Sequence, residues 1–150
     1  MTPFVTAGAA FLLAVLWFDL MFDVQAARHS APGLPESVLA STAAYYRRVT
    51  TAARPMNRFV AAVMAATIIA IVVQLVRGDA PRWAASVSLV LAAGAIGLAA
   101  VHTIPSAIRL GTRSDTVEGQ SRLARSILRD HLLCLAGVSA VLFVQLAFCR

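Results

Sequence analysis

Four long apolar stretches constrain this chain more than any other feature of its sequence. They are Phe4–Phe22, Phe59–Val76, Trp83–Val101 and Leu132–Phe148. A helix needs roughly 20 such residues to cross a bilayer. Only 13% of the 150 residues are charged, which leaves too little polar sequence to cover a soluble core. We therefore expect an all-α integral membrane protein with one domain, residues 1–150, whose four transmembrane helices span approximately 4–24, 57–76, 82–106 and 130–149.

The arginines predict how these helices are oriented. The chain has no lysine, and ten of its thirteen basic residues fall in the two connections that follow the first and the third span. Cytoplasmic loops of membrane proteins carry an excess of positive charge, so we expect both termini on the outer side. The charge is too sparse, and too often interrupted by apolar runs, for a nucleic-acid partner. We expect the lipid bilayer as the partner, in the inner (cytoplasmic) membrane of a bacterium.

Both cytoplasmic connections carry helix signals. Pro35 and Glu36 favour the start of a helix that runs to about Thr51. Its Tyr45 and Tyr46 suit the headgroup level, so we expect an interfacial helix before the second span, serving as an anchor or docking to anionic lipid or a partner. The second connection should turn at Gly111. Asp115 and Glu118 then have the spacing of a capping box, which predicts a cytoplasmic extension of the fourth span.

Polar residues gather where all four spans approach the cytoplasm. Asp19 and Asp23 lie four residues apart on one face of the first span, and His102 lies at a matching depth in the third. Ionisable groups at membrane depth are costly and normally pair with each other or line a cavity. We therefore predict a pocket that opens to the cytoplasm. Its candidate catalytic residues are Asp19, Asp23, His102 and His131, and its candidate ligand-binding residues are Asn57, Arg58, Arg109, Asp130 and Trp17.

Other interpretations of the same cluster stay open. Asp19 or Asp23 could form buried ion pairs with Arg58 or Arg109 that only hold helix ends together. His102, His131 and Asp23 form a two-histidine, one-carboxylate set of the type that binds a metal ion, and a haem between the two histidines is conceivable. Pro105 cannot donate to the carbonyl of Val101, so the third span should kink beside His102 or end there.

Small residues recur at helical spacing within the spans, which favours close packing of a four-helix bundle or contacts between protomers. Cys134 and Cys149 lie about 22 Å apart along one helix and cannot form an intramolecular disulfide. A homo-oligomer and membership of a larger membrane complex are both compatible with these patterns.

Two short motifs support a resemblance. His102-Thr103-Ile104-Pro105-Ser106, followed by Arg109-Leu110, ends the third span, and Arg129-Asp130-His131 opens the fourth. With the four-span layout, they resemble the small membrane proteins of the anthrone-oxygenase-like family. The resemblance implies a four-helix bundle and oxidation of an apolar aromatic substrate, with Asp19, His102 and His131 as candidates by position. The first-span motif around Asp19 and Asp23 is not part of that family's pattern.

The leading hypothesis is a membrane-embedded binding or redox protein. It would hold an apolar ligand, a quinone or a cofactor in the polar pocket, with Arg58 and Arg109 tuning the acids by their charge. A non-catalytic structural or assembly subunit is the main alternative, and a small oligomeric proton-coupled transporter is a third.

Overall fold

Each of the four apolar stretches forms a long helix in the computed structural model, which describes residues 1–29, 31–52 and 54–149. They are α1 (Thr2–Ala27), α3 (Arg54–Arg77), α4 (Arg82–Leu98) and α6 (Val117–Phe148). The chain is 88% helical, and the described ranges contain no strand. Four helices are long and apolar enough to cross a membrane, as the sequence predicted: Thr2–Ala27, Pro55–Arg77, the continuous helix Arg82–Thr112 that begins with α4, and Val117–Phe148.

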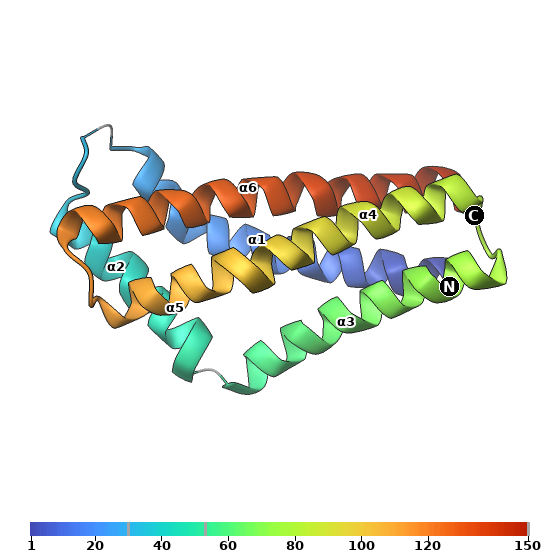
Figure 1. Ribbon diagram of the computed structural model, residues 1–150, viewed down its shortest axis with the longest axis horizontal. Helices are drawn as coiled ribbons and strands as arrows, with labels where there is room; N and C mark the ends of the chain where they lie inside the picture. The colour runs from blue at the N-terminus through green and yellow to red at the C-terminus, as the bar shows by residue number, and fades with distance from the viewer. Residues whose placement is uncertain (30, 53, 150) are drawn as a thin grey trace.

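The four long helices form an elongated bundle (Figure 1). α1 packs against α6 and α3, and α4 packs against the same two helices. The interior is built of small and medium side chains such as Ala9, Ala70 and Val138, while large apolar side chains such as Phe4 and Val101 face outward. Small residues let helix backbones approach closely, and an apolar exterior suits lipid. The predicted close packing of the spans is therefore present within a single chain.

A polar clasp closes the bundle at the end that holds both termini. The amides of Gln74 and Gln145 donate to each other, at 3.0 and 3.1 Å. Gln74 also donates to Thr2 Oγ1 and Gln145 to Ser88 Oγ. The clasp thus joins α1, α3, α4 and α6. Because both amides are fully buried, these bonds satisfy polar groups that would otherwise be costly inside the bundle.

The opposite end carries the connecting helices α2 (Glu36–Arg47) and η1 (Arg48–Ala52), a π-helical segment. The predicted helix from Glu36 to about Thr51 is therefore present. It packs against α5 (Ile104–Thr112) around a core that includes Leu39, Leu110 and Ile127. At Gly111 a Cβ atom would lie 2.9 Å from the backbone nitrogen of Arg47, so α2 and α5 touch at a site where only glycine fits.

Two local expectations at this end were wrong. The chain does not turn at Gly111, because α5 continues to Thr112 and Arg113 makes the turn with a φ of 54°. Asp115 does not cap α6, because Thr116 is the N-cap and its side chain accepts a hydrogen bond from Gly119 N. The carboxylate of Asp115 instead forms an ion pair with Arg109.

Pro105 neither ends nor breaks the third span. α4 passes through the π-helical turn η2 (Ala99–Thr103) into α5, and the combined helix runs from Arg82 to Thr112, beyond the expected end at 106. Pro105 has no N–H to offer, and the wider turn before it rearranges the carbonyls of the preceding residues. The expected disturbance beside His102 is thus a π-helical turn, which also re-aims His102 and Thr103.

Candidate functional site

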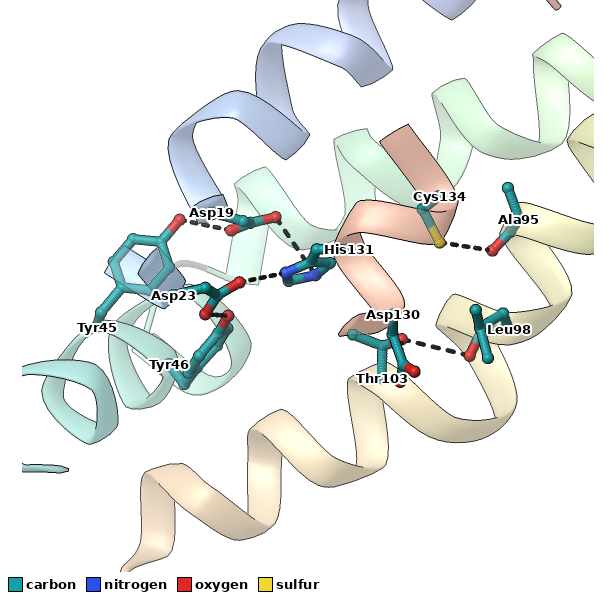
Figure 2. A network of polar contacts seen from close by, with 10 residues as sticks. All are labelled: Asp19, Asp23, Tyr45, Tyr46, Ala95, Leu98, Thr103, Asp130, His131 and Cys134. Carbon is teal, nitrogen blue, oxygen red and sulfur yellow. Dashed lines mark hydrogen bonds and ion pairs between the residues drawn. The ribbon is translucent and has the colours of Figure 1, made fainter. Parts of the chain in front are cut away.

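Polar side chains at the α2 end form two networks, which meet at two consecutive residues of α6 (Figure 2). One network joins α1, α2 and α6 around His131. The other joins η2 and α6 around Asp130. These are the His131 network and the Asp130 network.

The His131 network contains five side chains. Tyr45 donates to Asp19 Oδ1 at 2.6 Å, and Tyr46 donates to Asp23 Oδ1. His131 Nδ1 lies 2.6 Å from Asp23 Oδ2, while its Nε2 lies 3.9 Å from Asp19 Oδ2. Figure 2 shows the imidazole between the two carboxylates, with each tyrosine on its own aspartate. Consecutive tyrosines of α2 thus pair with aspartates one turn apart on α1.

The His131 network is mostly buried. Asp23 and Tyr46 are almost completely buried, and every buried side-chain oxygen and nitrogen of this network has a hydrogen-bond partner. Burial, together with the nearby Asp19 and Asp23 carboxylates, raises the pKa of Tyr45 and Tyr46 well above the ordinary value of 10.0. Both phenols therefore stay protonated and act as donors. This arrangement ties α2 to the bundle, while His131 Nε2, 3.9 Å from Asp19 Oδ2, makes no hydrogen bond to a described residue.

The Asp130 network is smaller and open. His102 Nδ1 lies 2.5 Å from Asp130 Oδ2, and Thr103 donates to the same oxygen at 3.2 Å. The Asp130 side chain is 1% exposed, whereas that of His102 is 46% exposed. Asp130 Oδ1 is the one buried side-chain oxygen or nitrogen in the described chain that lacks a hydrogen bond, although Arg129 lies 3.7 Å away. The buried carboxylate of Asp130 thus holds the half-exposed imidazole of His102 in place.

This geometry determines what the His102 ring can do. A carboxylate at Nδ1 favours the tautomer that carries its proton there, which leaves the Nε2 lone pair as a hydrogen-bond acceptor. No other hydrogen bond to this ring occurs among the described residues. His102 can therefore accept a hydrogen bond from a group that approaches from outside the bundle.

An apolar groove begins one helical turn from this pair. It lies between α4 and α6, has a volume of about 220 Å³, and is named here the α4–α6 groove. Its one thiol, Cys134, donates to the carbonyl of Ala95 at 3.4 Å. Its lining residues are Val90, Leu91, Gly94, Ala95, Leu98, Leu133, Cys134 and Gly137.

A second, polar cavity of about 460 Å³ lies where α5 turns into α6. Arg109 and Arg122 line it together with serine and threonine hydroxyls. The guanidinium of Arg109 forms two hydrogen bonds with Asp115, at 2.5 and 2.8 Å, and its charge is thereby matched within the cavity.

The structure brings only some of the predicted site residues together. Asp19, Asp23 and His131 form one group, and His102 and Asp130 form another. The expected ion pairs of Asp19 or Asp23 with Arg58 or Arg109 are not formed. Arg109 points to Asp115, and Arg58 is exposed near the start of α3, which diverges from α6 at this end (Figure 1). Tyrosine hydroxyls and His131 take the place of the arginines.

Three further predictions concern residues at or near these networks. Trp17 is 64% exposed on the outer face of α1, and Asn57 is partly exposed in the first turns of α3. The metal set proposed from sequence is divided, because His102 lies with Asp130 while His131 lies with Asp23. Across residues 1–29, 31–52 and 54–149, no group of three histidine, cysteine or acidic side chains is arranged to hold a metal ion.

Sequence reasoning missed Tyr45, Tyr46 and Thr103. By sequence alone the tyrosine doublet favours an anchor at the headgroups, since it stands beside Arg47 and Arg48. The sequence does contain one indication of these contacts. The two tyrosine hydroxyls can donate to two carboxylates one helical turn apart, and Asp19 and Asp23 have that spacing. Thr103 lies in the π-helical turn, and nothing in the sequence points to its hydrogen bond with Asp130.

The chain was compared with models of protein families, with curated proteins and with solved structures, and none of the three comparisons gives a match.

Proposed function

We propose that this chain is a multi-pass membrane protein that binds an apolar ligand carrying a hydroxyl group, with His102 as the acceptor of the hydrogen bond. A phenol or a quinol is the simplest ligand of this class. The single observation that carries the proposal is the pairing of a half-exposed imidazole with the buried carboxylate of Asp130.

Three features support this site over the His131 network. The His131 side chain is 9% exposed and lies between two carboxylates, whereas the His102 side chain is 46% exposed and its Nε2 has no hydrogen-bond partner among the described residues. The α4–α6 groove provides apolar surface one turn away. Sites for small apolar ligands usually combine such a surface with a few polar groups that orient the ligand. A hydrogen bond at this position would orient an aromatic substrate of the kind that the resemblance to the anthrone-oxygenase-like family implies.

We further propose that the α2 end faces the cytoplasm of a bacterium and that both termini lie outside. The support is the distribution of arginine, because both arginine-rich connections lie at the α2 end and the α3–α4 turn lies at the other (Figure 1). In this orientation α2 lies at the interface, and His102 lies on the cytoplasmic side of the bilayer.

Binding of 1-naphthol to the protein in phosphatidylcholine nanodiscs tests the ligand site, because the fluorescence of this probe reports binding directly. We expect saturable binding that weakens about tenfold in His102→Leu, since the loss of one hydrogen bond costs about 1.4 kcal/mol. His29→Leu is the matched control, because the His29 side chain belongs to neither network. Equal affinity for His102→Leu and the unmodified protein, or equally tight binding of naphthalene, would refute the proposal.

A further inference from the structure

We infer that the α4–α6 groove holds a linear hydrocarbon tail of the same ligand whose head binds His102. This inference rests on the proposed function and adds a tail to the ligand class.

The groove exists because two of its lining residues, Gly94 and Gly137, have no side chain. A Cβ atom added at Gly94 would meet no other atom within 4 Å, so the space above this residue is open. At Gly137 a Cβ atom would lie 3.6 Å from the carbonyl oxygen of Leu91, which shows that α6 and α4 are close there. Val90 and Leu133, which are both exposed, form the rims. The result is an apolar groove that is open to the outside of the bundle.

The groove and the Asp130 network share the same helix faces. On the third span, Leu91, Ala95, Leu98 and His102 follow one another at intervals of four, three and four residues. On α6, Asp130, Cys134 and Gly137 follow one another at intervals of four and three residues. Residues at these spacings lie above one another on one side of a helix. The groove therefore leads to His102 and Asp130, and Figure 2 shows the Cys134–Ala95 contact one turn from Asp130 and Thr103.

The chemistry of the groove favours hydrocarbon. Its one side chain with a hydrogen-bond donor, Cys134, already donates to Ala95. A polar occupant would lose its hydrogen bonds to water without replacement, which is costly, whereas an alkyl or isoprenoid chain loses none. The carboxylate of Asp130, with one oxygen lacking a hydrogen bond, marks the other end of the site as polar.

Length and direction fit a tail better than a second ring. From His102 to Val90 the third span rises roughly 18 Å, at 1.5 Å per residue. The groove follows the helices, so it runs along the long axis of the bundle. In the proposed orientation the head would sit at the cytoplasmic side and the tail would point to the bilayer centre, as an amphiphile in the same leaflet does.

Photolabelling in phosphatidylcholine nanodiscs tests this inference. The probe is 4-decylphenol with a diazirine in its tail, and labelled peptides are located by mass spectrometry. We expect labels on residues 90–98 and 133–137 that disappear when unmodified 4-decylphenol is added in excess. Gly94→Leu should abolish these labels, because its side chain fills the groove. Ala66→Leu, at an exposed small residue of α3, is the matched control and should leave them unchanged.

Two results would overturn the inference. Labels spread evenly over the lipid-facing residues of all four helices would show that the groove takes bulk lipid. Cross-linking of the groove to a second copy of the chain, unaffected by excess 4-decylphenol, would show that a helix of that copy fills it. In either case 1-naphthol binding that depends on His102 would still stand, so the tail can fail while the head site survives. If Gly94→Leu does not fold, Gly94→Val provides a smaller filling of the same space.

Discussion

Asp130 and His131 are consecutive residues of α6, yet their side chains bind different neighbouring helices. Asp130 accepts hydrogen bonds from His102 and Thr103 of η2, while His131 contacts Asp23 of α1. Successive positions on a helix differ by about 100° in direction, so a pair of this kind reaches two partners at once. α6 is thereby held in register with α1 on one side and with the third span on the other.

Tyr46→Phe should destabilise the protein more than Tyr45→Phe. The Tyr46 side chain is buried, and its loss leaves one oxygen of the buried Asp23 carboxylate without a donor, which costs about 1–3 kcal/mol. Tyr45 is only half-buried, and its aspartate is partly accessible, so we expect about 0.5–1.5 kcal/mol. The measurement is the free energy of unfolding in mixed micelles. A larger loss for Tyr45→Phe would contradict the role assigned to Asp23.

The tyrosines should also make the protein sensitive to alkaline pH. Their pKa values are raised above 10.0, so the folded protein keeps protons that the unfolded chain releases. Stability should therefore be complete below pH 10 and should fall as the pH rises above it. Since Tyr45 and Tyr46 are the only two tyrosines, the ultraviolet absorbance of tyrosinate reports on them alone. Ordinary titration of either residue near pH 10 in the folded protein would show that it is not held by its aspartate.

The clasp of Gln74 and Gln145 should show strong coupling in a double-mutant cycle. Gln74→Leu alone leaves the Gln145 amide without its partner, and each single change should cost about 1–3 kcal/mol. The double leucine variant should be less destabilised than the sum of the two, because it leaves no unpaired amide of this pair inside the bundle. Unfolding free energies of the three variants and the parent give the coupling. Simple additivity would mean that the reciprocal hydrogen bonds contribute nothing.

Gly111→Ala should loosen α2 from the bundle. Its Cβ would lie 2.9 Å from the Arg47 backbone nitrogen, and backbone atoms cannot move aside cheaply, so we expect a loss of about 1–3 kcal/mol. Gly97→Ala is the control, since its Cβ would meet nothing within 4 Å and alanine favours the helix by up to about 1 kcal/mol. Hydrogen exchange of the α2 amides should accelerate in the first variant only. Similar exchange rates in the two variants would show that the contact between Gly111 and Arg47 does not hold α2 in place.

The proposed orientation predicts the labelling of single added cysteines by a membrane-impermeant thiol reagent. Ser114→Cys, at the exposed α5–α6 corner, should be labelled only after intact cells are opened. Asp79→Cys, in the α3–α4 turn, should be labelled from outside. The parent protein is the control for Cys134 and Cys149, which are both buried. The reverse pattern would invert the orientation and place His102 in the outer leaflet.

The amino-acid sequence by itself determined the four helices and the end of the bundle at which polar residues gather. These properties depend on local composition: apolar runs must be helical in lipid because no water satisfies their backbone, and Pro35 with Glu36 favours the start of a helix. The helix at Glu36–Arg47 and the disturbance before Pro105 follow from the same local chemistry. The depth of a residue within a span also follows from the sequence, because it depends only on the number of residues from the end of the helix.

Only the tertiary structure decided which polar groups meet. Tyr45 and Tyr46 reach Asp19 and Asp23 because α2 folds back onto α1, and Arg58 misses them because α3 diverges. His102 of η2 binds Asp130 of α6, whereas His131, which lies on α6 itself, faces Asp23 of α1. Such pairings depend on how each helix is rotated about its axis and on a π-helical turn of five residues. The spacing of residues along the sequence does not determine either of these. The same rotation leaves one imidazole buried among its partners and the other open beside an apolar groove.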